Sequence, residues 1–133
     1  MHSQKGFTLL EILIAITLLV IIGGVMVSQF GGVLGQNQVK LTQVGMDSVA
    51  TALDTYRADN ARYPTTDQGL EALVNKPDGA KFWPTGGYLK KLPQDGWGND
   101  YIYSSQGSTF ELISLGADAQ EGGEGEDADI TYQ

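Results

Sequence analysis

The first quarter of the chain contains a long apolar run with one charged residue inside it. No residue from Ile12 to Val27 is charged, and the apolar stretch extends from Phe7 to Phe30. As a helix this stretch would be roughly 36 Å long at 1.5 Å per residue, enough to cross a hydrocarbon core of about 30 Å. The pattern predicts a transmembrane helix. Glu11 is unexpected there, because a carboxylate inside a membrane span costs roughly 2.5 to 3.5 kcal/mol and needs a partner.

Beyond Phe30 the apolar positions follow the three-to-four spacing of an amphipathic helix. The positions on this face are Val39, Thr42, Met46, Val49, Leu53 and Tyr56. We therefore expect the helix to continue over 31–60 and to stop between Asn60 and Pro64, because the residue before a proline disfavours helix. Glycine weakens a helix relative to alanine, so the join is expected either to bend or melt or to admit close packing of neighbouring helices. The glycines concerned are Gly23, Gly24, Gly31, Gly32 and Gly35.

Shorter elements are predicted in the second half of the chain. Thr65 with Gln68 resembles a capping box, which predicts a short helix through about Asn75. The apolar side of this helix would be Leu70, Leu73 and Val74. Alternating residues predict strands at 101–104 and 110–115, joined as a hairpin, and a third short strand at 130–132. The fold class expected from this order is α+β, with one long helix packed on a small domain.

Four aromatic residues fall in the loop between the predicted short helix and the hairpin. They are Phe82, Trp83, Tyr88 and Trp97. So many aromatic side chains are expected to lie on a core. Trp97 with Tyr101 could instead form a ligand platform, but residues beside Pro93 and Gly96 in so small a domain favour the core interpretation.

Composition excludes several classes of function. The 133 residues include no cysteine, so disulfides, thiolate metal sites and cysteine nucleophiles are excluded. The only histidine is His2, and no G-x-S-x-G elbow, P-loop or dinucleotide fingerprint is present, which argues against an enzyme. The formal charge of -8 argues against a nucleic-acid partner.

The last sixteen residues are the most acidic part of the chain. They contain six acids among glycines, namely Asp118, Glu121, Glu124, Glu126, Asp127 and Asp129. Carboxylates on a glycine-rich backbone suit calcium, which takes 6 to 8 oxygen ligands. The same composition is also typical of a disordered acidic tail. The residues alone leave both interpretations open.

The amino terminus resembles the leader of type IV pilins and type II secretion pseudopilins. The residues that carry this resemblance are GFTLLE, with Gly6 before Phe7 and a lone Glu11. A cleaved secretory signal peptide and a plain membrane anchor are the alternatives, but the first lacks an A-x-A-like site and the second leaves Glu11 unexplained. The resemblance implies that a prepilin peptidase removes residues 1–6 and methylates the new Phe7 amine. It also implies that Glu11 pairs with the Phe7 amine of a neighbouring subunit during assembly.

The remaining sequence resembles the major, G-type pseudopilins of type II secretion systems. The stretches concerned are ALDTYRADNARYPTTDQGLEALV, GGYLKKLPQDGWGNDYIY and ELISLGADAQEGGEGEDADI. The absence of cysteine agrees, because many type IV pilins close a carboxy-terminal loop with a disulfide. Two departures from the family pattern are Ser28, where a proline is usual, and Thr131-Tyr132-Gln133, where Gly-Asn-Trp is usual.

The resemblance also implies a structural Ca²⁺ site in the acidic loop. By position, Asp118 and Asp129 match the first and last aspartates of the family's site. Asp127 is the next candidate, Leu115 would contribute its carbonyl, and Glu126 with the Gly125 carbonyl are further candidates. The ion would neutralise the cluster and clamp the loop.

The function implied is that of a structural subunit and not of an enzyme. The expected parts are a leader at 1–6, a transmembrane and fibre-core half at 7–30, an amphipathic half at 31–60 and a periplasmic domain at 61–133. Subunits would leave the inner membrane and form a helical homopolymer, with minor pseudopilins, an assembly platform and its ATPase as partners. The alternatives are a type IV pilus subunit and a membrane-tethered periplasmic binding module.

Overall fold

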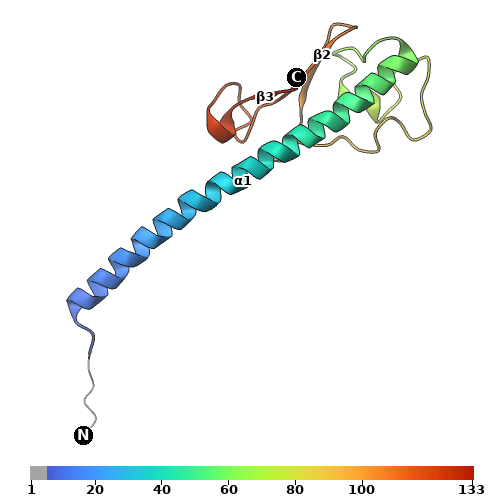
Figure 1. The fold of residues 1–133 in the computed structure, drawn as a ribbon. Helices are drawn as coiled ribbons and strands as arrows, with labels where there is room; N and C mark the ends of the chain where they lie inside the picture. The colour runs from blue at the N-terminus through green and yellow to red at the C-terminus, as the bar shows by residue number, and fades with distance from the viewer. Residues whose placement is uncertain (1–5) are drawn as a thin grey trace. The chain divides into compact units, whose positions relative to one another are not determined.

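The computed structural model describes residues 6–133, except the side chains of 23–31. The chain divides into two compact units, Met1–Gln36 and Asn37–Gln133. Apart from Gly6, the predicted leader lies outside the described residues. In chain order the elements are α1 (Leu9–Asn60), η1 (Leu70–Leu73), β1 (Ile102–Ser105), β2 (Phe110–Ser114), η2 (Gly125–Asp127) and β3 (Ile130–Thr131) (Figure 1).

The long helix α1 runs without a break from Leu9 to Asn60. A melted join at the glycines would have divided it in two, so the predicted melting is not found. Gly32 lies in open space, with no heavy atom within 4 Å of where a Cβ would be. Gly23, Gly24 and Gly31 belong to the segment whose side chains lie outside the described set.

The end of α1 agrees with the predicted stop. Ala61, the first residue beyond the helix, has a left-handed φ of 66° and donates its N–H to the Arg57 carbonyl at 2.7 Å. Asn60 is buried, and its Oδ1 accepts the Phe82 N–H at 3.0 Å. The helix therefore ends with a backbone cap and a side chain that binds the following loop.

The core of the second unit lies on one face of α1. Met46, Val49, Leu53 and Tyr56 are almost completely buried, which confirms the predicted amphipathic face. They belong to one cluster with Tyr63, Leu70, Leu73, Tyr101, Tyr103 and Leu112. Burial of each large apolar side chain contributes roughly 1.5 to 3 kcal/mol, so this face holds much of the unit together.

The predicted helix from Thr65 to Asn75 is wrong in length and type. The capping contacts are present, because Gln68 Oε1 accepts the Thr65 N–H at 2.9 Å and Thr65 Oγ1 accepts the Gln68 N–H at 3.2 Å. However, Gly69 has φ 61° and ψ -168°, outside the helical region, and only the 3-10 turn η1 follows. The predicted apolar side is confirmed at both leucines of η1, which are buried.

The strands form an antiparallel sheet in the order β1-β2-β3. Their bounds agree with the predicted strands to within one residue. Tyr103 of β1 pairs with Leu112 of β2, and both are buried. Their neighbours Ile102 and Glu111 are exposed, as expected when alternate residues face opposite sides of a sheet. Gly107, with φ 86°, lies in the hairpin turn.

The aromatic loop lies on the core, as predicted. Trp83 and Tyr88 pack against the core cluster and meet edge to face, with ring centroids 5.3 Å apart. The Tyr88 hydroxyl donates to Asp59 Oδ2 at 2.9 Å and accepts from Asn60 Nδ2 at 3.1 Å. Burial, with the Asp59 carboxylate as the next cause, raises the pKa of Tyr88 to about 12. Two of the four aromatics differ from the prediction: Phe82 is 52% exposed, and Trp97 is half-buried but does not pack against the core cluster.

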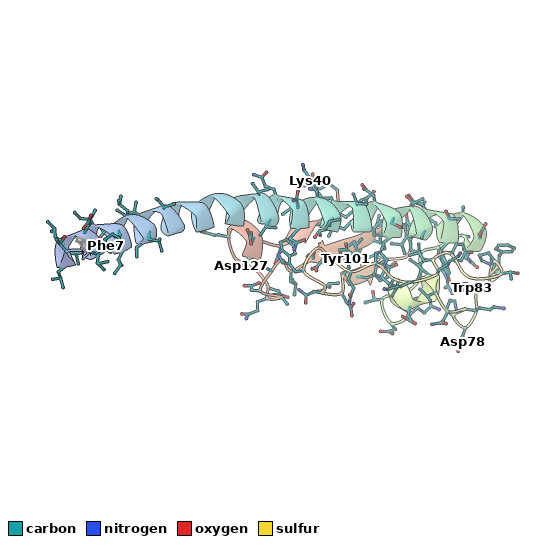
Figure 2. The ribbon with its side chains drawn as sticks, turned by 90° about the horizontal axis from the view of Figure 1, so that it is seen from below. Phe7, Lys40, Asp78, Trp83, Tyr101 and Asp127 are labelled. Atoms are coloured by element: carbon teal, nitrogen blue, oxygen red, sulfur yellow. The ribbon has the colours of Figure 1, made fainter. Side chains whose placement is uncertain are left out.

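The same loop touches α1 at Gly96. Its N–H donates to Thr42 Oγ1 at 2.9 Å, and a Cβ at Gly96 would collide with the backbone of Gln38. The hydroxyl of Tyr101 lies 3.0 Å from the Thr42 carbonyl and 3.2 Å from the Gln94 carbonyl (Figure 2). Tyr101 is therefore a core residue that fastens the loop to the helix, which agrees with the core interpretation of this aromatic.

Gly96→Ala is expected to destabilise the second unit by about 1 to 3 kcal/mol, because the added methyl needs space that the α1 backbone occupies. Gly32→Ala is the matched control, since its methyl would enter open space in a helix that favours alanine. Thermal unfolding of the full chain in detergent, followed by tryptophan fluorescence, measures both variants. Equal melting temperatures for Gly96→Ala and the wild type would contradict the close contact.

Candidate functional site

The predicted processing position lies just before α1. Gly6, Phe7 and Thr8 belong to no helix or strand and are exposed, Phe7 to 80%. No heavy atom lies within 4 Å of a Cβ position at Gly6. The peptide bond between Gly6 and Phe7 is therefore in an exposed stretch of chain rather than inside the helix.

Glu11 takes part in a capping box at the start of α1. The Thr8 N–H points to Glu11 Oε2 at 3.4 Å, and Thr8 Oγ1 accepts the Glu11 N–H at 3.2 Å. This reciprocal pair satisfies two backbone donors that the first turn of a helix leaves without partners. A carboxylate in the first turn also interacts favourably with the helix dipole. Glu11 thus has a structural role within its own chain.

Thr8 is a functional residue that our reading of the sequence missed. The signal was available, because Thr-Leu-Leu-Glu at the beginning of an apolar run is the T-x-x-E pattern of a capping box.

The first turns of α1 present an uncovered apolar surface. Every side chain from Leu9 to Ile22 is exposed. Eleven of these residues are large apolar ones, namely Leu9, Leu10, Ile12, Leu13, Ile14, Ile16, Leu18, Leu19, Val20, Ile21 and Ile22. Among the described residues, no helix meets the length and apolarity required of a membrane span. Part of the predicted transmembrane half, at 23–30, lies outside the described side chains.

The acidic loop joins β2 to β3 and contains all the predicted calcium ligands. Leu115 opens the loop and Asp129 closes it, with η2 in between. Asp118 Oδ1 accepts the Gln120 N–H at 3.0 Å, and Asp129 Oδ2 accepts the Gly122 N–H at 3.0 Å. The terminal aspartates of the predicted site therefore each organise a turn of the loop.

The two ends of this loop meet through their backbone. Ala117 donates its N–H to the Glu126 carbonyl at 2.9 Å. Gly116 is held so closely that a Cβ there would lie 2.7 Å from the Glu126 carbonyl oxygen and 2.9 Å from that of Ala128. Across residues 6–133, no three His, Cys, Asp or Glu side chains form a group able to hold a metal ion. Among these described residues, the predicted carboxylate ligands Asp118, Asp127 and Asp129 therefore do not form such a group.

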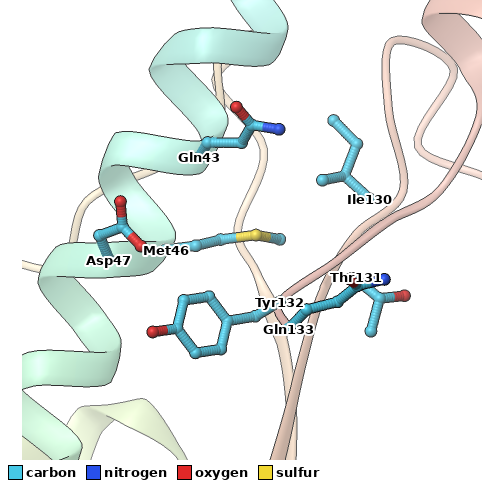
Figure 3. Close-up of a pocket in the computed structure, with 7 residues that line it drawn as sticks. All are labelled: Gln43, Met46, Asp47, Ile130, Thr131, Tyr132 and Gln133. Carbon is cyan, nitrogen blue, oxygen red and sulfur yellow. The ribbon is translucent and has the colours of Figure 1, made fainter.

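A groove of about 430 Å³ separates α1 from the end of the chain. Gln43, Met46 and Asp47 line it from the helix, and residues 130–133 line it from β3 and the carboxy terminus (Figure 3). Asp47 is the acidic side chain of its lining, and Gln43, Thr131, Tyr132 and Gln133 supply neutral polar side chains.

Comparison with known proteins assigns the sequence of this chain to a family. Residues 29–133 match the family described as Type II secretion system (T2SS), protein G. The chain belongs to that family. Residues 1–27 match the prokaryotic N-terminal methylation motif, which agrees with the predicted pilin-type leader.

Individual relatives agree over nearly the whole chain. The type II secretion system core protein G of Pseudomonas aeruginosa is 48% identical over 134 residues, which cover 97% of this chain and 94% of that protein. The core protein G of Vibrio cholerae is 46% identical over 98% of this chain and 92% of its own length. The crystal structure of the major pseudopilin from the type 2 secretion system of enterohaemorrhagic Escherichia coli matches with a TM-score of 0.62 and 37% identity, covering 72% of this chain and 86% of that one.

Membership of the protein G family decides between the interpretations of the sequence. The chain is a type II secretion major pseudopilin with a type IV pilin-like α+β fold, and its family consists of structural subunits and not of enzymes. The match over 29–133 favours a secretion subunit over a type IV pilus subunit or a binding module. The methylation motif favours the pilin-type leader over a secretory signal peptide.

Removal of the Thr8 hydroxyl is expected to loosen the first turn of α1. Replacing an N-cap threonine by an apolar residue typically costs about 0.5 to 2 kcal/mol, so amide hydrogen exchange at 9–12 should accelerate in Thr8→Val. Thr8→Ser should keep the cap. Thr17→Val is the matched control, because the Thr17 hydroxyl bonds to the Leu13 carbonyl inside the helix. Equal exchange in Thr8→Val and Thr8→Ser would contradict the capping box.

Proposed function

We propose that this pseudopilin polymerises into the periplasmic pseudopilus and helps to drive folded exoproteins through the outer-membrane secretin. The observation that supports this most is the uncovered apolar surface of Leu9–Ile22, on which every side chain is exposed. A contiguous apolar surface of this kind is typical of a site that contacts other proteins or lipid. Lipid would cover it before assembly and helices of other copies would cover it in the fibre.

Processing would precede assembly. In this proposal a prepilin peptidase cuts between Gly6 and Phe7, whose peptide bond is exposed, and methylates the new Phe7 amine. The subunit is then anchored in the inner membrane by a single pass, with its carboxy-terminal domain in the periplasm. Minor pseudopilins, an inner-membrane platform and its ATPase are the further partners we infer from the family.

Glu11 would act twice in this assembly. Within its own chain it closes the capping box with Thr8. In the fibre its carboxylate would also accept the charged Phe7 amine of a neighbouring copy, since a carboxylate has two oxygens that can accept several donors. An opposite charge nearby is far more favourable in a low-dielectric bundle than in water. The pair would therefore select the correct register between neighbouring subunits.

A substitution that removes the charge of Glu11 but keeps its shape separates these two roles. Glutamine also serves in capping boxes, so Glu11→Gln should keep slow amide exchange in the first turn of α1. Because it has no charge for the amine, it should reduce the yield of sheared pseudopili in cells at least tenfold and abolish exoprotein secretion. Thr17→Val, which alters neither group, is the control for expression and processing. Wild-type fibre yield from Glu11→Gln would refute the proposed pairing.

We further propose that the acidic loop binds a structural Ca²⁺ ion. Asp118 and Asp129 would hold it together with the Leu115 carbonyl, and Asp127 is the next candidate ligand. Glu126 and the Gly125 carbonyl remain further candidates. The support is chemical, because the loop offers hard oxygen donors and its ends already meet through the Ala117 N–H and the Glu126 carbonyl. The bound ion would neutralise mutual repulsion among the carboxylates.

Calcium is therefore expected to raise the melting temperature of the full chain in detergent. At ten times a dissociation constant of about 0.1 to 1 mM, binding to the folded state stabilises by about 1.4 kcal/mol, which amounts to several degrees. Asp118→Ala should lose this increase, whereas Asp78→Ala, which removes an exposed aspartate outside the loop, should retain it. An increase that is the same in both variants would show that calcium acts elsewhere.

A further inference from the structure

Asp95 is a buried carboxylate to which neither assembly nor ion binding assigns a role. Its side chain is 6% exposed, and it accepts three hydrogen bonds. Oδ1 accepts the N–H groups of Trp97 at 3.0 Å and Asn99 at 2.8 Å, and Oδ2 accepts the Ser114 hydroxyl at 2.7 Å. A buried charge is costly unless it is paired or fully hydrogen-bonded, so these partners fix its position closely.

The residues that Asp95 holds are in contact with α1 on one side. Gly96, the next residue, donates its N–H to Thr42 Oγ1, and the Thr42 hydroxyl donates in turn to the Gln38 carbonyl at 2.8 Å. Tyr101 approaches the carbonyl of Thr42 from the same loop. Burial, followed by the charge of Asp95, raises the pKa of Tyr101 to about 12. The segment from Asp95 to Tyr101 is therefore attached to one turn of the helix.

On its other side the same segment is attached to the start of the acidic loop. Ser114 Oγ donates to Asp95 and accepts the Gly116 N–H at 3.3 Å. The Asn99 side chain donates to the Gly116 carbonyl at 3.4 Å. Gly116 in turn packs against the Glu126 carbonyl near the far end of the loop. A continuous series of contacts thus connects the acidic loop, Asp95 and α1.

We propose that Asp95 is a positioning residue that couples the ordering of the acidic loop to the Gln38–Thr42 turn of α1. If the loop loses its native conformation, Ser114 and Gly116 lose their fixed geometry. One acceptor oxygen of the buried carboxylate then loses its donor. The turn from Asp95 to Asn99 loosens as a result and, with it, the hydrogen bond from Gly96 to Thr42.

The coupling has a consequence for the surface of α1. The turn that it reaches contains Leu41 and is followed by Val44, two large apolar residues of the second unit that are 59% and 65% exposed. In our proposed function such apolar positions are covered by other copies. An ordered acidic loop would therefore keep this part of the helix rigid on the surface of the subunit. An ion bound in the loop would add to that rigidity.

A double-mutant cycle tests the coupling without any ion. Gly123→Ala perturbs the loop directly, because Gly123 has φ 89° and a Cβ there would lie 2.5 Å from the Asp127 carbonyl oxygen. Ser114→Ala removes the link to Asp95. In urea unfolding of the full chain in detergent with a chelator, the effect of Ser114→Ala on the unfolding equilibrium constant should be about threefold smaller when Gly123→Ala is present.

Thr66→Val is the matched control for that cycle. The Thr66 hydroxyl accepts the Ser105 N–H at 3.0 Å, at the end of β1 next to the hairpin turn, so its loss has no part in the proposed series. Its effect should combine additively with Gly123→Ala. Additivity for Ser114→Ala as well would overturn the coupling.

Amide hydrogen exchange provides a readout that a purely local structural role would not change. Gly123→Ala should accelerate exchange of the Gly96 amide at least threefold, and this response should disappear when Ser114→Ala is already present. The Gly107 amide, which is bonded to Ser105 Oγ, should not respond. An unchanged exchange rate of the Gly96 amide in Gly123→Ala would refute the proposal. The mutant exchange measurements, like the urea cycle, are made with a chelator. Calcium added to the wild type without chelator should slow exchange at Gly96. If calcium fails to bind, only the proposed ion site fails, because neither mutant test depends on the ion.

Discussion

The packing of loops and sheet onto one face of α1 is the constraint on which the second unit depends. Met46, Val49 and Leu53 are buried on this face, and the loop reaches the helix backbone itself at Gly96. Only a residue without a side chain allows that approach. The polar groups at the contact are satisfied because the Gly96 N–H binds Thr42 and the Thr42 hydroxyl binds the Gln38 carbonyl. Apolar burial supplies most of the stability there, and these hydrogen bonds determine the register.

The amino-terminal end of the same helix has no buried face of this kind among the described side chains. Its apolar side chains from Leu9 to Ile22 are exposed in the single chain, so they pack on no core of that chain and are available for association. Glu11 combines local and intermolecular requirements in one side chain. It caps its own helix with Thr8, and in our proposal it also binds the amine of a neighbour. On this proposal, the carboxylate stands at the fifth residue counted from Phe7 because there it can serve both the capping box and the neighbour's amine.

Buried polar residues distinguish this domain from a simple apolar core. Asp95 of the aromatic loop and Ser114 at the end of β2 are hydrogen-bonded to each other and buried, where an apolar pair could also fill space. A satisfied carboxylate costs desolvation energy, but it requires its three donors at defined positions. In our proposal that requirement transmits the state of a charged surface loop to the helix. The effect is small in energy, yet it acts at the part of the subunit from which a polymer would be built.

The sequence by itself determined the features that depend on neighbouring residues along the chain. The spacing of Met46, Val49 and Leu53 predicted the buried face, and alternation predicted the strands within one residue, because helix and strand periodicities are local. The family resemblance could also be recognised from the sequence, in GFTLLE and in three longer stretches. Only the tertiary structure decided that Gly69 would interrupt the predicted short helix, since several backbone conformations are open to glycine.

Tertiary structure also decided which acidic residue would be buried. Asp95 resembles any acid in a glycine-rich loop, and nothing near it in sequence indicates a partner nineteen residues away in Ser114. Gly96 meets Thr42 across fifty-four residues. Such contacts arise from the way in which distant segments close over a common core, and their identity depends on the three-dimensional path of the chain. Local patterns establish the elements, whereas long-range packing assigns the roles of individual polar residues.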